Sequence, residues 1–417
     1  MPTLNWIGKE AVVKHHKEVP FRLLEPVPEL SCGDAVSGNL IVQGDNLHAL
    51  KALLPRYAGQ VKCIYIDPPY NTGNEGWVYN DNVNSPEIRK WLGEVVGKEG
   101  ETLDRHDRWL SMMYPRLVLL KQFLREDGAI FVSIDDNEVG NLQALMREVF
   151  GATNEVATIV WEKGKKGDSK LVSVTHEYIV VFARNKALLK ERKVRWRRKK
   201  PGIDAVLEHY ESLRKKHGDD HATIRKEMMA WYRALPKGDP RKGHKHYNWS
   251  DKRGLYFAAD FAGPDDGREN RPRYPILQGY TPLAGKKRVP VEGLGGGFQF
   301  CRLSGEPLFD AEGQIRRDVT FAQLAEFVWF AETGTGFTGQ ADSPLLGVHE
   351  GRAIYLLYNG ILKDRSVAGG NVLTGPVFDV LPKFAGPKVI YAAANRIGGR
   401  AAREGITFKQ TPYALEV

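Results

Sequence analysis

Four consecutive residues suit chemistry on the exocyclic amine of a nucleobase: Asp67, Pro68, Pro69 and Tyr70. Such an amine is a poor nucleophile, because its lone pair is delocalised into the ring. The Asp67 carboxylate can accept one amine hydrogen, and the two prolines fix φ so that a backbone carbonyl can face the other. The Tyr70 ring can stack on a base that is flipped out of a duplex. The alternative is an ordinary tight turn, which uses the same residue types.

Two apolar runs are expected to position this tetrapeptide and a second acidic segment. Residues 63–66 (CIYI) have the pattern of a strand that leads into Asp67. Residues 40–42 have the pattern of a strand that leads into Asp45, and leucines at helical spacing over 47–54 connect the two strands. Asp45 and Asp67 then lie at the carboxyl ends of two strands, where open α/β sheets bind ligands.

The rest of the N-terminal half continues this alternation of strands and helices. Helical spacing over 109–120 is followed by a strand pattern at 128–134, a helix over 139–150 and apolar segments at 156–161 and 178–182. The sequence therefore predicts an α/β fold with a doubly wound, mostly parallel, Rossmann-like sheet. Short strand patterns predict a small α/β or α+β module at the C-terminal end, at 298–303, 353–358, 389–393 and 406–409.

A basic stretch at 190–200 follows the predicted sheet and indicates contacts with nucleic-acid phosphates. The candidate DNA-binding residues are Arg192, Arg195, Trp196, Arg197, Arg198, Lys199 and Lys200. A polar, helical region over 205–235 comes next, and the alternative for both segments is a charged linker with a solvated helix. His244 and His246 lie in a basic loop without neighbouring cysteines or carboxylates. We interpret them as polar contacts and expect no metal site.

The composition favours a polyanionic partner. The chain of 417 residues carries a formal charge of +9, and it is long enough for two or three domains. Its 3 cysteines have no paired spacing, which argues against a disulfide scaffold or a structural zinc site and favours the cytoplasm. No apolar run reaches the length of a membrane span, so we expect no membrane association.

Residues 5–184 resemble the N-terminal half of the modification subunits of type III restriction-modification systems, a class of DNA adenine N6 methyltransferases. The matching segments are 5–10 (NWIGKE), 44–46 (GDN), 67–73 (DPPYNTG), 133–138 (SIDDNE) and 175–178 (THEY). The resemblance implies that Asp67, Pro68, Pro69 and Tyr70 handle the target adenine. It also implies that Asp45, Asn46 and Asp67 lie near S-adenosylmethionine.

The resemblance divides the chain into three regions. These are a methyltransferase region (1–184), a basic target-recognition region (185–277) and a C-terminal module with an assembly role (278–417). One family segment has no counterpart here: a strand that runs into Phe-x-Gly-x-Gly, whose glycines let S-adenosylmethionine lie against the backbone. The segment that ends in 270–275 (NRPRYP) instead joins, near 276–278, to sequence that resembles the family's next segment after that motif.

Two glycine-rich segments are possible substitutes for the missing one. Residues 293–298 have no apolar strand before them, which favours a turn. Residues 330–339 come closer, because the apolar residues 327–329 precede them and the glycine spacing is nearly that of the family.

The resemblance implies transfer of a methyl group from S-adenosylmethionine to adenine N6 in double-stranded DNA, as part of a restriction-modification system. A homodimer and an ATP-dependent restriction subunit are the implied protein partners. The missing glycine segment favours a second hypothesis, a catalytically inactive DNA-binding or assembly subunit. Methylation of cytosine N4 is a third hypothesis, which Asp67 disfavours because adenine enzymes more typically carry Asp at this position.

Overall fold

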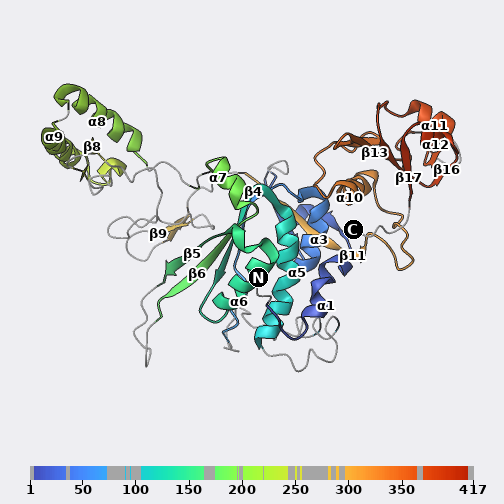
Figure 1. Ribbon diagram of the computed structural model, residues 1–417, viewed down its shortest axis with the longest axis horizontal. Coiled ribbons are helices and arrows are strands. Elements are labelled where there is room, and N and C mark those ends of the chain that lie inside the picture. Colours follow the sequence, from blue (N-terminus) through green and yellow to red (C-terminus); the bar gives the residue numbers. More distant parts are fainter. Residues whose placement is uncertain are drawn as a thin grey trace. The chain divides into compact units, whose positions relative to one another are not determined.

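The fold is described from a computed structural model, which forms two compact units. Unit 1 comprises Met1–Arg192 and Gly296–Val417, and unit 2 comprises Lys193–Gly295 (Figure 1). The structure describes residues 4–33, 38–72, 90, 94, 105–163, 174–194, 196, 201–218, 220–242, 249–250, 254–255, 280–282, 288–290, 296–363 and 370–411.

A four-stranded sheet with the order β3-β4-β6-β5 forms the centre of unit 1. Its strands are β3 (Val61–Ile66), β4 (Leu124–Ile134), β5 (Glu155–Glu162) and β6 (His176–Ala183). β3 and β4 are parallel, whereas β6 is antiparallel to both β4 and β5. The predicted α/β class is confirmed, but this sheet is mixed and not mostly parallel. β5 and β6 follow one another in the chain and pair antiparallel, which makes the sheet mixed.

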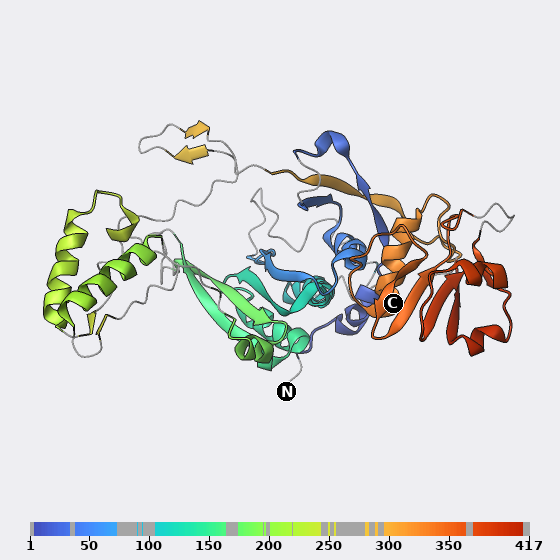
Figure 2. The same ribbon diagram turned by 90° about the horizontal axis from the view of Figure 1, so that it is seen from above.

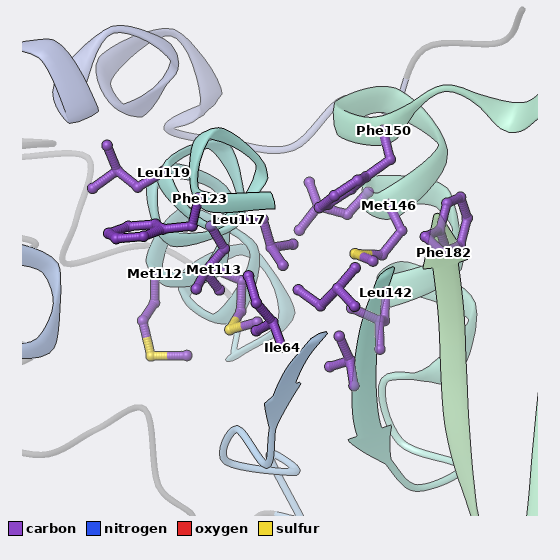
Figure 3. Close-up of a cluster of buried hydrophobic side chains, with 14 of the residues drawn as sticks. Ile64, Met112, Met113, Leu117, Leu119, Phe123, Leu142, Met146, Phe150 and Phe182 are labelled. Atoms are coloured by element: carbon purple, nitrogen blue, oxygen red, sulfur yellow. The ribbon is translucent and has the colours of Figure 1, made fainter. Parts of the chain in front are cut away.

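Two helices cover one face of this sheet, α5 (Arg105–Phe123) and α6 (Val139–Phe150). Ile64, Ile130 and Phe182 are register partners across three strands and point into the same apolar cluster. Figure 3 shows side chains of both helices converging on this layer: Met112, Met113, Leu117, Leu119, Phe123, Leu142, Met146 and Phe150. The core therefore fixes β3 and β4, and with them the segments that leave their carboxyl ends.

A three-stranded sheet combines segments that are distant in the sequence. It consists of β1 (Arg22–Pro26), β11 (Gln299–Pro307) and β2 (Leu40–Gln43), in that order. The predicted strand–helix–strand unit forms as β2, α3 (Asn46–Tyr57) and β3, but its two strands belong to different sheets. Among the described residues, β2 pairs with β11 alone and β3 with β4 alone. Among the described residues no strand joins β2 to β3, so Asp45 and Asp67 follow strands of two separate sheets.

The C-terminal part of unit 1 contains the sheet β12-β13-β15-β17. Its strands are β12 (Leu345–His349), β13 (Arg352–Leu356), β15 (Lys388–Ala392) and β17 (Ile406–Gln410), drawn in orange to red in Figure 2. The last three are parallel, as expected for a small α/β module. Glu332, nearly buried, forms ion pairs with Arg352 and Lys409 and accepts a hydrogen bond from Tyr391. This carboxylate ties the helix α10 (Phe321–Thr333) to three strands of the sheet.

The glycine-rich segment 330–339 begins inside α10 and ends as a contact with α3. Residues 327–329 are helical and not the strand that a cofactor loop requires, because their large apolar side chains belong to a stripe packed on the module's core. Gly334 caps the helix in the left-handed conformation. The Gly336 amide then donates to the Ala58 carbonyl at 2.8 Å, and the Phe337 amide donates to the Pro55 carbonyl at 2.9 Å. Gly336 and Phe337 thus join the C-terminal module to the end of α3.

Unit 2 contains a helical hairpin with a core of its own. α8 (Ile203–His217) and α9 (His221–Ala234) confirm the predicted helical region, and they are the yellow-green pair in Figure 2. Their buried side chains pack on one another: Ile203, Val206, Tyr210, Leu213, Ile224, Met228, Tyr232 and Leu235. Short strand pairs also belong to this unit, namely β7 (Trp249–Ser250) with β8 (Gly254–Leu255) and β9 (Tyr280–Pro282) with β10 (Arg288–Pro290).

The remaining elements are short. They are α1 (Lys9–Val13), α2 (His15–Glu18), α7 (Lys186–Glu191), α11 (Gly375–Val380) and α12 (Arg400–Arg403), the 3-10 helices η1 (Pro28–Leu30) and η4 (Ala152–Asn154), and the strand pair β14 (Val372–Leu373) with β16 (Ala394–Asn395). In the described part of the chain, no helix is both long and apolar enough to cross a membrane.

The contact between Gly336 and α3 yields a stability prediction. A Cβ at Gly336 would lie 2.4 Å from the Arg56 carbonyl oxygen, which is backbone and cannot turn aside. We expect Gly336→Ala to lower the free energy of unfolding by about 1–3 kcal/mol, the usual penalty of overpacking. Gly140→Ala is the matched control, because nothing lies within 4 Å of its Cβ position. Equal urea midpoints for the two variants would contradict the packing role of Gly336.

Candidate active site

Three segments meet at one edge of the sheet β3-β4-β6-β5. Because β3 and β4 are parallel, Asp67 and Asp135 leave their strands at the same edge. β6 is antiparallel, and Ile134 at the end of β4 pairs with Tyr178 near the start of β6. The sheet therefore brings together the segments 67–72, 135–138 and 176–178, which lie far apart in the sequence.

A buried carboxylate, Glu138, holds the segment that follows Tyr70. Its side chain has 0% exposure, and it accepts hydrogen bonds from Asn71, from His106 Nδ1 at 2.6 Å and from Asn141 Nδ2 at 2.8 Å. Asn71 is in the left-handed region with φ of 58°, a conformation that Asn tolerates better than most residues. The Asn71 amide also donates to the Arg105 carbonyl at 3.2 Å. These bonds fix the chain directly after the Asp67–Tyr70 tetrapeptide.

Helix α5 holds the tetrapeptide by its backbone. The indole of Trp109, which is fully buried, donates a hydrogen bond from Nε1 to the Pro69 carbonyl at 2.7 Å. Pro69 cannot donate a backbone hydrogen bond, so this carbonyl is its only polar backbone group, and Trp109 satisfies it. Pro68 and Pro69 follow β3 without forming a regular element.

Tyr70 is half-buried beside two carboxylates. Its hydroxyl donates to Glu177 Oε2 at 3.1 Å, and Lys163 Nζ lies 5.6 Å from the ring centroid while forming an ion pair with the same glutamate. Burial raises the pKa of Tyr70, and the carboxylates of Asp67 and Glu177 raise it further. The phenol is therefore a neutral hydrogen-bond donor throughout the physiological range.

Asp45 and Asn46 lie at the start of α3 and take part in local hydrogen bonds. Asp45 is the N-cap of α3, and its Oδ1 accepts from the amides of Leu47 at 2.9 Å and His48 at 3.1 Å. Arg116 Nε donates to Asn46 Oδ1 at 2.7 Å and lies with Nη2 3.8 Å from Asp45 Oδ2. Asp45 and Asn46 follow β2, so they do not share a sheet with Asp67.

Of the candidate DNA-binding residues, the structure describes Arg192 and Trp196. Arg192 Nη1 lies 3.9 Å from Asp127 Oδ2, near the start of β4 and thus at the opposite end of that strand from Asp135. Hydrogen bonds from Lys62 and Arg125 lower the pKa of Asp127 to about 2. Trp196 is 46% exposed. The other candidates lie outside the described residues: Arg195, Arg197, Arg198, Lys199 and Lys200.

Several residues around the site had no role in the sequence interpretation: Asn71, Trp109, Glu138, Lys163 and Glu177. Asn71, Glu138 and Glu177 belong to the segments DPPYNTG, SIDDNE and THEY, so the matching segments pointed to them without indicating what they contact. Trp109 was part of a helical apolar pattern. For Lys163 the sequence carries no signal, because its position depends on the pairing of β5 with β6.

Comparisons with known proteins match the part of the chain that carries this site. A family model described as DNA methylase matches residues 61–252, which include β3, the tetrapeptide and the Glu177 segment. This part of the chain is therefore similar to DNA methylases. The EcoP15I Mod subunit of Escherichia coli, a type III restriction-modification enzyme, is 38% identical over 201 residues, which are 45% of this chain and 31% of that subunit.

A second relative is the EcoPI Mod subunit of Escherichia phage P1, which is 42% identical over 200 residues, or 44% of this chain and 30% of the subunit. The chain is thus related to type III modification subunits, and the match spans about a third of their length. The solved structure of the cytosine-N4-specific PvuII DNA methyltransferase overlaps at a TM-score of 0.22 and 15% identity, over 36% of this chain and 50% of that one. This low score bears on neither fold nor function.

The buried carboxylate gives a second stability prediction. Glu138→Ala leaves the donors of Asn71, His106 and Asn141 without their acceptor, so we expect the free energy of unfolding to fall by about 3 kcal/mol. Glu126→Ala removes an acid of the neighbouring strand β4 that is 63% exposed, and its effect should stay under about 0.5 kcal/mol. Equal losses in denaturant titrations would show that Glu138 does not hold this segment.

Proposed function

We propose that the chain handles the target base of a site-specific DNA adenine N6 methyltransferase in a restriction-modification system. The observation that carries this proposal is the placement of Asp67 and Tyr70 at the carboxyl edge of β3, with their backbone held by Trp109 and Glu138. A rigid backbone lets an acceptor and a stacking surface keep their geometry towards a flipped base.

In this proposal the residues act on the two hydrogens of the adenine amine. The Asp67 carboxylate accepts one hydrogen, and this draws electron density back onto the nitrogen. The Pro69 carbonyl is engaged by Trp109, so the Pro68 carbonyl is the candidate acceptor for the other hydrogen. Tyr70 stacks on the base. Adenine is favoured over cytosine because Asp, not Ser, opens the tetrapeptide.

S-Adenosylmethionine is the methyl donor of this family, but the described residues do not form a complete site for it. Asp45, expected near the cofactor, uses one carboxylate oxygen to cap α3. The glycines at 334 and 336 end a helix and pack on another, whereas a cofactor loop leads from a strand into a helix. Residues 293–295 of the other glycine-rich segment lie outside the described residues.

This mismatch favours a second candidate function, a DNA-binding or assembly subunit without activity of its own. The specific observation is that β2 and β3 each lie at the outer edge of a separate sheet among the described residues. A methyl donor bound beside β3 would need backbone that these residues do not supply.

The partners belong to the same proposal. Double-stranded DNA is supported by the formal charge of +9. The names of the two relatives, each a Mod subunit of a type III restriction-modification enzyme, support an ATP-dependent restriction subunit as a partner. A homodimer, a cytoplasmic location and the division at 184 and 277 into methyltransferase, target-recognition and assembly regions remain predictions.

The mismatch with the cofactor is tested by calorimetry. We expect purified protein to bind S-adenosylmethionine weakly or not at all, because the strand and glycine loop that would hold it are absent from the described residues. A dissociation constant in the micromolar range would contradict this expectation. In that case Asp45→Asn, measured in parallel, would decide whether Asp45 contributes to the binding.

The role of Asp67 is tested by methyl transfer. Tritiated S-adenosylmethionine and genomic DNA free of N6-methyladenine serve as substrates, since such DNA contains every short recognition sequence. We expect Asp67→Ala to slow transfer by about two to four decades and to leave DNA binding intact. Glu312→Gln, an exposed acid far along the chain, is the control. An Asp67→Ala protein with normal activity would refute the assignment, and a wild-type protein without activity would favour the second candidate.

A further inference from the structure

The two helices of unit 2 differ in the charge that they expose. Their buried residues pack on one another, so each helix has an outer face that is turned to solvent. On α8 this face carries a row of exposed acids at helical spacing, Asp204, Glu208 and Glu211. On α9 it carries two exposed cations, Lys226 and Arg233, which lie about two helical turns apart. The hairpin therefore has an acidic side and a basic side.

The acids at α9 do not offset its cations. Glu227, the only acid within α9, forms an ion pair with Lys216 of α8, with Nζ 3.4 Å from Oε1. Asp220 caps the helix, since its carboxylate accepts from the Thr223 amide at 3.1 Å and from the Thr223 hydroxyl at 2.7 Å. Among the described residues, no carboxylate forms an ion pair with either of the two exposed cations. Both positive charges thus remain available to a partner.

The side chains between these cations are short. Ala222 and Ala230 lie four residues before and after Lys226 on the same side of α9, and both are exposed. A helix face that contacts water alone usually carries long polar side chains. Here a partner with regularly spaced negative charges can come close to the helix and meet both cations. The alanine methyl groups form no hydrogen bonds, so they cannot read the polar edges of bases.

We propose that the outer face of α9, marked by Lys226 and Arg233, binds the phosphate backbone of double-stranded DNA. This inference rests on the proposed function and adds a second surface to the candidate residues at 192–200. DNA suits the face because it carries one negative charge per about 1.7 Å of its axis. The same phosphates repel the acidic face of α8, so the hairpin binds through one helix only. Phosphate contacts position a protein on DNA without reading its sequence.

The first test measures how the binding of fluorescently labelled DNA duplexes by the full chain depends on salt. Each phosphate contact contributes about 0.9 to the slope of log K against log salt concentration. We expect Lys226→Gln and Arg233→Gln each to reduce the slope by about 0.9, and the double variant by about 1.8. The reduction should be the same on duplexes of unrelated sequence. An unchanged slope would overturn the proposal, provided that circular dichroism shows the helices intact.

Lys215→Gln is the matched control, because Lys215 is an exposed cation of α8 that lies on its acidic side. The substitution removes the same charge from the same hairpin and should leave the slope unchanged. If Lys215→Gln and Lys226→Gln reduced the slope equally, net charge would account for the binding, and the proposal would be wrong.

The second test adds a negative charge to the proposed contact. Ala230→Glu places a carboxylate between the two cations, where it would face phosphates, whereas Ala230→Gln adds a side chain of the same size without charge. We expect the Glu variant to bind duplex DNA about tenfold more weakly than the Gln variant at low salt, because like charges that meet in an interface repel each other. Equal affinities would show that this face stays away from the DNA.

The measurements require no methyl transfer, and their outcomes separate this inference from the proposed function. Wild-type protein without affinity for duplex DNA would contradict both. Binding that ignores the substitutions on α9 would contradict this inference alone. Duplex RNA of the same sequence is measured in parallel, and a preference for RNA that is lost in Lys226→Gln would make RNA the partner and overturn the assignment to DNA.

Discussion

A carboxylate sealed from water constrains the whole site. Glu138 has no exposure, and a buried charge is tolerated only when donors surround it. Those donors come from Asn71, from α5 through His106 and from α6 through Asn141. To satisfy one side chain, the chain after β3 must turn inwards and two helices must meet at the same edge of the sheet. The hydrogen bonds to Glu138 therefore also restrict the backbone of the tetrapeptide, which directly precedes Asn71.

The mixed character of the central sheet matters for the chemistry. In a purely parallel sheet, only strand ends would face the site, and each would contribute the segment that follows it. Here the antiparallel β6 starts at the site, so Glu177 is the second residue of a strand and pairs there with Trp161 of β5. A side chain on such a strand is held more precisely than one on a loop, which suits a residue that accepts the Tyr70 hydroxyl.

Local patterns in the sequence predicted the elements better than their connections. The helix predicted at 139–150 coincides with α6, and all four strand patterns near the C-terminal end form strands, because periodicity reports which face of an element is buried. Residues 327–329 were misleading, since a short apolar run fits a helix as well as a strand. The pairing of β2 with β11 could not be predicted from the sequence, because nothing in either segment indicates a partner about 260 residues away.

The same limit applies to the site. Asp67, Pro68, Pro69 and Tyr70 could be singled out because their types express the chemistry, and Glu138 and Glu177 fell within recognisable segments. The contacts themselves arise from long-range pairing: Glu177 meets Tyr70 across 107 positions, and Trp109 meets Pro69 across 40. Residue type indicates what a side chain can do, whereas only the sheet register determines what it touches.

During synthesis, the strands of the β1-β11-β2 sheet are made far apart in time. All four strands of the central sheet have been synthesised once the chain reaches Ala183, so the core of this sheet can form early. β1 and β2 must wait for β11, which begins at Gln299, and until then their edges lack this partner strand. The nascent chain thus carries two unpaired strand edges through most of its synthesis, the state in which a β-strand is most prone to wrong partners.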